Sequence, residues 1–230
     1  MIISGKVKSR CEKLKISLDR YENELRLLSD LGFTDKQINK LILRDSSKKT
    51  VSTLISNFKS LRQLDHDVMT HDVVSSIAWR HGGGKALNSL LESFDLLNTR
   101  PYKLKTSQII RIVSNNGGAK NIEAVKNSFD VLKNINFSSE QIVSMVSHGG
   151  GSKNIEAVKN SFNQLKNLNF SAEQIVKIAS NIGGSKNIEA VKNSFKALKN
   201  LNFSAFQIVK IASNIGGSRN VKVVMNSFEE

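Results

Sequence analysis

The stretch KIASNIGGSKN, at Lys177–Asn187, nearly recurs as KIASNIGGSRN at Lys210–Asn220. Two further copies read SMVSHGGGSKN at Ser144–Asn154 and RIVSNNGGAKN at Arg111–Asn121. Two adjacent residues change between the copies (Asn-Asn, His-Gly, Asn-Ile and Asn-Ile), whereas the Gly-Gly behind them is constant. A stretch that returns at a fixed period indicates a repeat protein.

The repeat period is 33 residues, marked by Phe137, Phe170 and Phe203. Repeats 137–169 and 170–202 agree at 25 of 33 positions. A related repeat starts at Leu104, and the last one, 203–230, ends before its 33 positions are complete. Segments 33–68 and 69–103 keep the same spacing of apolar residues in diverged form. We therefore predict two regions in one stack: degenerate repeats over 1–103 and regular repeats over 104–230.

Each repeat has the pattern of two helices. Ser171 and Gln174 have the spacing of a capping box at the start of the first helix, with Phe170 and Ile175 as its hydrophobic staple. The second helix carries one apolar stripe, Ile188, Val191, Phe195 and Leu198. Neither helix can bury its stripe alone, so we predict an all-α fold in which two-helix units stack into a superhelical solenoid.

Composition narrows the function. The formal net charge is +14, which favours a polyanionic partner such as nucleic acid or an acidic membrane surface. No apolar run reaches the length of a membrane span. Of the two polyanions we expect nucleic acid as the partner and no membrane. The four histidines are scattered without cysteine partners, and no nucleophile–base motif is recognisable. We therefore expect no metal, no cofactor and no enzymatic activity.

The Gly-Gly pairs lie between the two helices of each repeat, and a cation follows each pair. Glycine permits positive φ and a close backbone approach, and free N–H groups at a helix start attract phosphate. A simple inter-helix turn with solvated lysines explains a single copy as well, but four copies on a basic chain favour a phosphate-binding ladder. The predicted phosphate-binding residues are Gly117, Gly118, Lys120, Gly150, Gly151, Lys153, Gly183, Gly184, Lys186, Gly216, Gly217 and Arg219.

The motif EQIVKIASNIGG, on paired helices of about this length, closely resembles the repeats of bacterial transcription activator-like effectors. Segment 77–125 is similar to the N-terminal region of that family, where degenerate repeats precede the array. The chain departs from the family by lacking its usual Pro in the second helix and by having Ser185-Lys186 after Gly-Gly. The resemblance implies a monomer that binds double-stranded DNA, with non-specific DNA contact by 1–103.

In this family the first residue of the variable pair braces the loop and the second faces a base in the major groove. Carried over by position, the bracing residues are Asn115, His148, Asn181 and Asn214. The base-reading residues are Asn116, Gly149, Ile182 and Ile215. The family's pairings imply guanine or adenine for Asn-Asn, thymine for His-Gly and adenine for Asn-Ile. Whether repeat 104–136 reads a base is left open.

Trp79 lies in the inter-helix loop of segment 69–103, between Arg80 and the preceding helix. A sole tryptophan is often a core residue. The family, however, has a loop tryptophan here, near the thymine that precedes the target. The resemblance therefore implies that Trp79 contacts this 5′ base and that Arg80 binds phosphate.

Two other functions fit a helical solenoid. Ankyrin repeats, which bind proteins, also have 33 residues, but the T-P-L-H motif is absent here. Some helical repeats read RNA one base at a time.

The resemblance further implies a bacterial origin, with action in a host nucleus for a secreted effector and otherwise in the bacterial cytoplasm or nucleoid.

Overall fold

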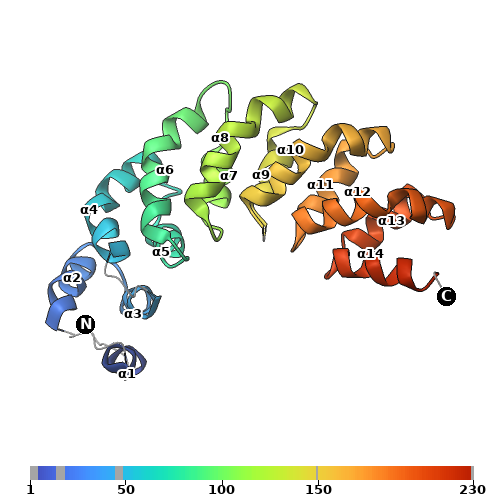
Figure 1. Cartoon of the computed structure of the whole chain (residues 1–230). Coiled ribbons are helices and arrows are strands. Elements are labelled where there is room, and N and C mark those ends of the chain that lie inside the picture. Colours follow the sequence, from blue (N-terminus) through green and yellow to red (C-terminus); the bar gives the residue numbers. More distant parts are fainter. Residues whose placement is uncertain (1–4, 14–18, 45–48, 149, 229–230) are drawn as a thin grey trace. The chain divides into compact units, whose positions relative to one another are not determined.

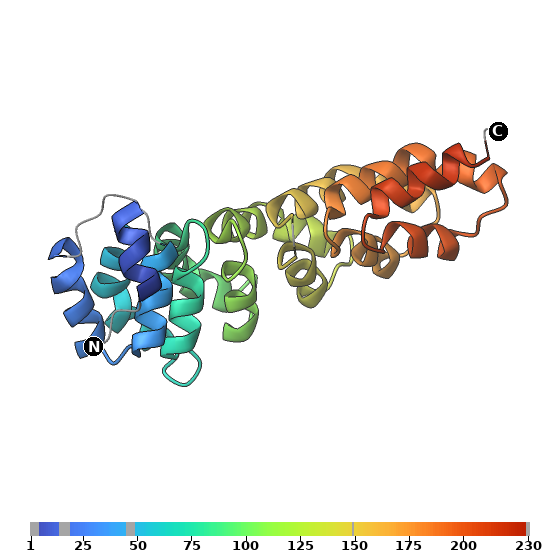
Figure 2. The ribbon, with the colours of Figure 1, turned by 90° about the horizontal axis from the view of Figure 1, so that it is seen from below.

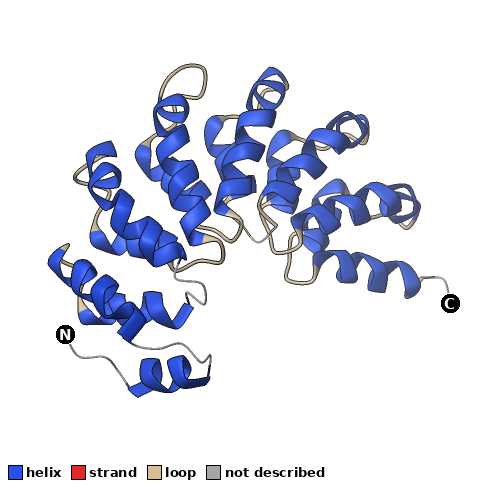
Figure 3. Ribbon diagram, turned by 60° about the vertical axis from the view of Figure 1, so that its left-hand side comes forward, coloured by secondary structure: helices blue, strands red, loops and turns tan. Residues whose placement is uncertain are grey.

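The computed structural model describes residues 5–13, 19–44, 49–148 and 150–228. Within these residues the chain is all-helical and has no strand (Figure 3). The chain forms two compact bodies. The N-terminal body comprises residues 1–99 and 105–119, and the C-terminal body comprises 100–104 and 120–230. The predicted boundary after residue 103 concerns the type of repeat and stays a prediction.

The N-terminal body alternates shorter and longer helices. The longer α4 and α6 pack along each other, and α5 packs on both. At the other end of the body, α3 contacts α1, α2 and α5. Its helices are α1 (Gly5–Lys13), α2 (Asp19–Asp30), α3 (Asp35–Arg44), α4 (Lys49–Leu64), α5 (His71–Ala78), α6 (Gly83–Asn98) and α7 (Thr106–Val113).

The C-terminal body has two rows of helices, in which α10, α12 and α14 lie side by side and α9, α11 and α13 form the second row (Figures 1 and 2). Contacts between sequence neighbours are those expected of a helical repeat. Its helices are α8 (Gly118–Asn134, of which the first two residues belong to the N-terminal body), α9 (Ser139–Val146), α10 (Ser152–Asn167), α11 (Ala172–Ala179), α12 (Gly184–Asn200), α13 (Ala205–Ala212) and α14 (Gly217–Asn226).

The predicted capping boxes are confirmed. The Gln174 backbone N–H donates to Ser171 Oγ at 3.2 Å, and the Ser171 N–H donates to Gln174 Oε1 at 2.9 Å. The same reciprocal pair opens α9 and α13. Two of the otherwise unpaired amides at each helix start are thereby satisfied.

The predicted apolar stripe is also confirmed, because Ile188, Val191 and Leu198 are fully buried in α12. Phe170 and Phe195 meet edge to face, with ring centroids 5.1 Å apart, an arrangement that aromatic pairs favour. Phe170 and Phe195 are therefore core residues. Repeat 104–136 has Leu104 where its neighbours have Phe, and Tyr102 supplies the ring, 4.7 Å from Phe129.

An asparagine with positive φ follows three long helices of the C-terminal body, namely α8, α10 and α12. Asn169 has φ 63°, its N–H bonds to the Lys166 carbonyl at 2.8 Å, and the Phe170 N–H bonds to Leu165 at 3.1 Å. This pair of bonds is the Schellman motif, with Asn in the left-handed position that is usually Gly. Asn136 and Asn202 have the same positive φ. The motif turns the chain back so that Phe170 reaches the core.

Candidate nucleic-acid interface

The loops between short and long helices carry the variable pairs. In the C-terminal body, the loops before α10, α12 and α14 follow one another along one edge (Figure 1). Ile182 and Ile215, the predicted base readers of two loops, are 74% and 91% exposed. An isoleucine this exposed contributes little to packing, so both side chains are available to a partner. Asn116, in the N-terminal body, is exposed as well, and Gly149 lies outside the described residues.

The first residue of the pair turns back to its own helix. The Asn181 side-chain amide donates to the Lys177 carbonyl at 2.6 Å, and His148 Nδ1 lies 2.6 Å from the Ser144 carbonyl. In the N-terminal body, Asn115 donates to Arg111 at 2.9 Å. Each contact uses one of the carbonyls that a helix leaves unpaired at its C-terminus. Asn214 is exposed. At Asn181 and Ile182 the first side chain is bonded back to its own helix and the second is exposed.

The backbone geometry of the inter-helix turn accounts for the Gly-Gly pairs. Gly183 has φ 78°, a left-handed conformation that is strained for other residues. At Gly184, a Cβ atom would overlap the Ala179 carbonyl oxygen. The turn therefore requires both glycines whether or not a phosphate is present. A simple inter-helix turn is enough to explain why glycines are present. A role in phosphate binding therefore needs support from other residues.

The helix amides are less available than the sequence interpretation assumed. At α14 all four N-terminal amides donate within the chain, so free N–H groups do not attract phosphate there. The bonds run from Gly217 to Asn214 (2.9 Å), from Ser218 to Asn187 Oδ1 (2.8 Å), and from Arg219 and Asn220 to Gly216 (2.7 and 2.9 Å). The backbone amides at this helix start are therefore not available to an anion.

The loop conformation of the His-Gly copy differs from that of the Asn-Ile copies. Here Gly151 is the N-cap, with φ 45° and ψ −119°, and α10 begins at Ser152. In the Asn-Ile copy the N-cap is Gly183, with φ 78° and ψ 20°, and α12 begins one position earlier in the repeat. The two kinds of loop therefore do not share one backbone conformation.

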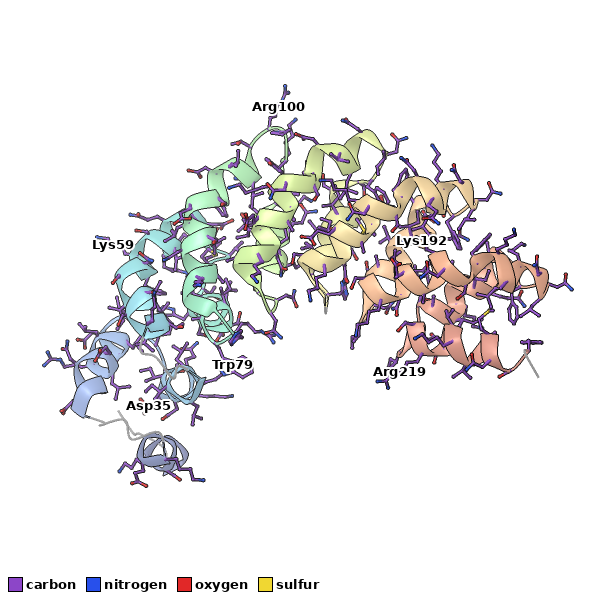
Figure 4. The ribbon with its side chains drawn as sticks, viewed as in Figure 1. Asp35, Lys59, Trp79, Arg100, Lys192 and Arg219 are labelled. Carbon is purple, nitrogen blue, oxygen red and sulfur yellow. The ribbon has the colours of Figure 1, made fainter. Side chains whose placement is uncertain are left out.

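The predicted cations are accessible. Lys120, Lys153, Lys186 and Arg219 are exposed near the starts of the long helices. Figure 4 shows Arg219 projecting from the start of α14, whereas Lys192 lies farther along α12. Lys192 pairs with Glu189 at 3.1 Å, so part of its charge is neutralised. The cations nearest the loops are therefore the better phosphate candidates.

Cations and carboxylates share a groove between α8 and α10. Its volume is about 440 Å³, and Lys120 and Lys159 line it together with Glu123 and Glu156. Polar side chains, including Asn127 and Ser152, complete the lining. Mixed charge makes this groove a poor site for an isolated anion.

Trp79 caps the C-terminal end of α5 and is half-buried (labelled in Figure 4). The Lys40 ammonium lies 4.2 Å from its ring centroid, and the Arg80 guanidinium lies 5.5 Å away. Both distances are within the range of cation–π attraction. Lys40 comes from α3, and sequence reasoning missed it because nothing in the sequence links residues this far apart.

Sequence reasoning also missed three buried asparagines, Asn121, Asn154 and Asn187. Each follows its Gly-Gly loop at a constant interval, and Asn220 has the same position in the last repeat. Segment 69–103 has Ala86 there. The sequence did contain a signal for these residues: four repeats have Asn at this position, whereas the diverged segment 69–103 has Ala.

Comparison with known proteins finds no matching family model and no matching curated protein. Within the described residues, no helix is both long and apolar enough to cross a bilayer. The same residues contain no cluster of three or more side chains suited to holding a metal ion.

Proposed function

We propose that this chain is a transcription activator-like effector-like protein that binds double-stranded DNA and reads one base per repeat. The observation that carries the proposal is the loop geometry of Asn181 and Ile182. One side chain is bonded back to its helix at 2.6 Å, and the next is 74% exposed beside a glycine turn. A side chain presented in this way can be exchanged without changing the scaffold.

The proposed architecture is a superhelix of two-helix units of about 33 residues. Its support is that α9, α11 and α13 have equal length and start at equivalent positions, Ser139, Ala172 and Ala205. A duplex repeats its base pairs at a constant rise, so a protein that reads it base by base needs units of constant size.

In the proposed complex, phosphates are bound mainly by side chains near the loops, namely Lys120, Lys153, Lys186 and Arg219. Such contacts fix the register of the protein on DNA but carry no sequence information. The dipole of each long helix adds a favourable potential at the same end. The Gly-Gly pairs act by shaping the loop rather than by offering free amides.

The proposed readout follows the order of the pairs. Asn116 can donate to the N7 atom of a purine in the major groove, and Gly149 leaves room for a thymine methyl group. Ile182 and Ile215 have no polar side-chain atom, so they act by packing and exclusion, and their adenine preference comes from the family. The site then reads 5′-(G/A)-T-A-A-3′.

The N-terminal region, 1–103, is proposed to bind DNA without sequence preference apart from a thymine before the site. Trp79 is the proposed contact to that thymine, with Arg80 on a phosphate. Lys40 joins them as a second cation at the ring, 4.2 Å from its centroid.

We propose a monomer of bacterial origin that acts in a host nucleus if secreted and otherwise on bacterial DNA, without catalytic activity.

Binding to another protein is the second candidate, and exposed apolar residues of the C-terminal body favour it. Phe206 and Val223 are 65% and 63% exposed. The equivalent positions of the preceding repeat are Glu173 and Ala190. Large exposed apolar side chains that break the repeat pattern are typical of protein contact surfaces.

A competition experiment tests the proposal. The full chain is bound to a labelled duplex containing TGTAA, and unlabelled duplex, RNA of the same sequence and single strands compete. We expect the matched duplex to compete best and an altered duplex less well. Preferential competition by RNA or single strands, or no binding to any nucleic acid, contradicts the proposal.

A further inference from the structure

Three asparagines of the C-terminal body are buried almost completely. Asn121, Asn154 and Asn187 are 1%, 0% and 1% exposed. A buried side-chain amide is tolerated when its oxygen and its nitrogen both find hydrogen-bond partners. Their partners connect one repeat to the next.

Each side-chain oxygen accepts a hydrogen bond from the following repeat. The donor is the backbone N–H of the serine just behind the next Gly-Gly. The pairs are Ser152 to Asn121 (3.0 Å), Ser185 to Asn154 (2.9 Å) and Ser218 to Asn187 (2.8 Å). These bonds join residues 31 positions apart, so they are contacts between repeats and not within one helix.

The side-chain nitrogen holds the asparagine's own loop. Asn187 donates to the carbonyl of Ile182 at 3.4 Å, and Asn220 donates to the carbonyl of Ile215 at 3.1 Å. In the His-Gly repeat, Asn154 donates instead to Met145, at the end of α9, at 3.3 Å. The asparagine therefore contacts the proposed reader directly in the Asn-Ile repeats.

We propose that Asn187 is a positioning residue that holds its own reading loop and ties it to the next one. The inference rests on the proposed function. Through one side chain, the backbone of Ile182 is bonded to the start of the helix that follows Ile215. The spacing of two adjacent readers is thus fixed by hydrogen bonds as well as by packing. Asn121 and Asn154 make the same bond between the other repeats. Segment 69–103, which precedes the region assigned to base reading, has Ala86 at this position and cannot make the bond.

The first arm of the test needs no DNA. Amide hydrogen exchange is measured by NMR in the full chain, in Asn187→Ala and in the matched variant Asn154→Ala. We expect Asn187→Ala to lose protection at Ser218 and keep it at Ser185, and Asn154→Ala to do the reverse. Unchanged protection at both serines would overturn the link.

The second arm measures discrimination between duplexes that differ at the bases assigned to Ile182 and Ile215. We expect Asn187→Ala to lose discrimination at both bases, from the fivefold or more typical of a wrong base toward no preference. Asn187→Asp, at pH 8, keeps an acceptor for Ser218 but has no N–H for Ile182. We expect it to lose discrimination at the first base and keep it at the second. A fall in affinity with unchanged discrimination indicates a purely structural role and overturns the proposal.

The two arms separate the possible failures. If the unmodified chain does not discriminate between the duplexes, the proposed base reading fails, and the positioning role fails with it even where Ser218 is protected. If the chain discriminates and Asn187→Ala discriminates equally well while Ser218 exchanges freely, base reading stands and the positioning role is wrong.

Discussion

The side-chain amide of Asn181 donates to the backbone carbonyl of Lys177 at 2.6 Å. This bond closes the last turn of α11 and leaves Ile182 as the outermost side chain of the loop, 74% exposed. If the loop reads DNA, the bond limits the number of conformations that must be ordered on binding.

Replacing Asn181 with Ala should therefore weaken DNA binding more than it weakens the fold. We expect about 1 kcal/mol less unfolding free energy, the usual contribution of one hydrogen bond, and a severalfold loss of affinity for the matched duplex. Urea unfolding and a binding titration measure the two effects. The control is Asn193→Ala, at an exposed position of α12 away from the loop. Equal affinity of both variants would contradict the bracing role.

The two glycines of a pair should differ when replaced. Gly183→Ala meets no atom nearer than 3.8 Å, so its cost is the left-handed backbone, about 1–2 kcal/mol. Gly184→Ala overlaps the Ala179 carbonyl and requires α11 and α12 to move apart, so it should cost more. Urea unfolding of both variants gives the comparison. A smaller cost at Gly184 would show that the close approach between the helices is not a requirement of the fold.

Salt dependence should identify the phosphate contacts. We expect log K to fall steeply with log[salt], and the double change Lys153→Ala and Lys186→Ala to reduce the slope by roughly 0.9 per lost contact. The loss should be similar for every duplex sequence. Lys199→Ala, at the far end of α12, removes the same charge away from the loops and should leave the slope unchanged. A slope that responds equally to all three lysines would show that only net charge matters.

Trp79 should report DNA binding by fluorescence, because it is the sole tryptophan of the chain. We expect its emission to change on titration with duplex, and Lys40→Met to weaken binding because a cation 4.2 Å from the ring centroid is lost. The control is Lys59→Met, on the exposed surface of α4 (Figure 4). Emission that stays constant at saturating DNA would remove Trp79 from the interface.

The sequence was sufficient for the parts of the fold that depend on local patterns. The capping boxes at Ser171 and Ser204 and the stripe through Ile188 and Leu198 are local, and the structure has them as predicted. Contacts between distant segments could not be predicted in this way. The bond from Ser218 to Asn187 and the approach of Lys40 to Trp79 depend on how helices stack, which periodicity alone does not specify.

The conformations of the inter-helix loops also could not be predicted from local sequence patterns. The Gly-Gly pairs look alike in sequence, but Gly151 has φ 45° and α10 begins at Ser152, whereas Gly183 has φ 78° and α12 begins at Gly184. The amides of α14 were predicted to be free, and the acceptors they found include a side chain from the preceding repeat. Backbone hydrogen bonding is decided by the assembled fold, so sequence reasoning alone did not show that the amides at the start of α14 already have acceptors.

The most direct test of base reading is Ile182→Gly, which turns the pair Asn-Ile into Asn-Gly. In the family that it resembles, Asn-Gly favours thymine, so the preference at this one base should change from adenine to thymine. The change should be about 1 kcal/mol, the low end for a wrong base, because isoleucine makes no bidentate bond. The neighbouring bases should be read as before.

The measurement is a binding titration of both proteins against the four duplexes that differ only at the base assigned to Ile182. We predict that the unmodified chain binds the adenine duplex best, that Ile182→Gly binds the thymine duplex best, and that the order at the Ile215 base is unchanged. If neither protein distinguishes the four duplexes, the variable pair does not read DNA, and the central claim is wrong.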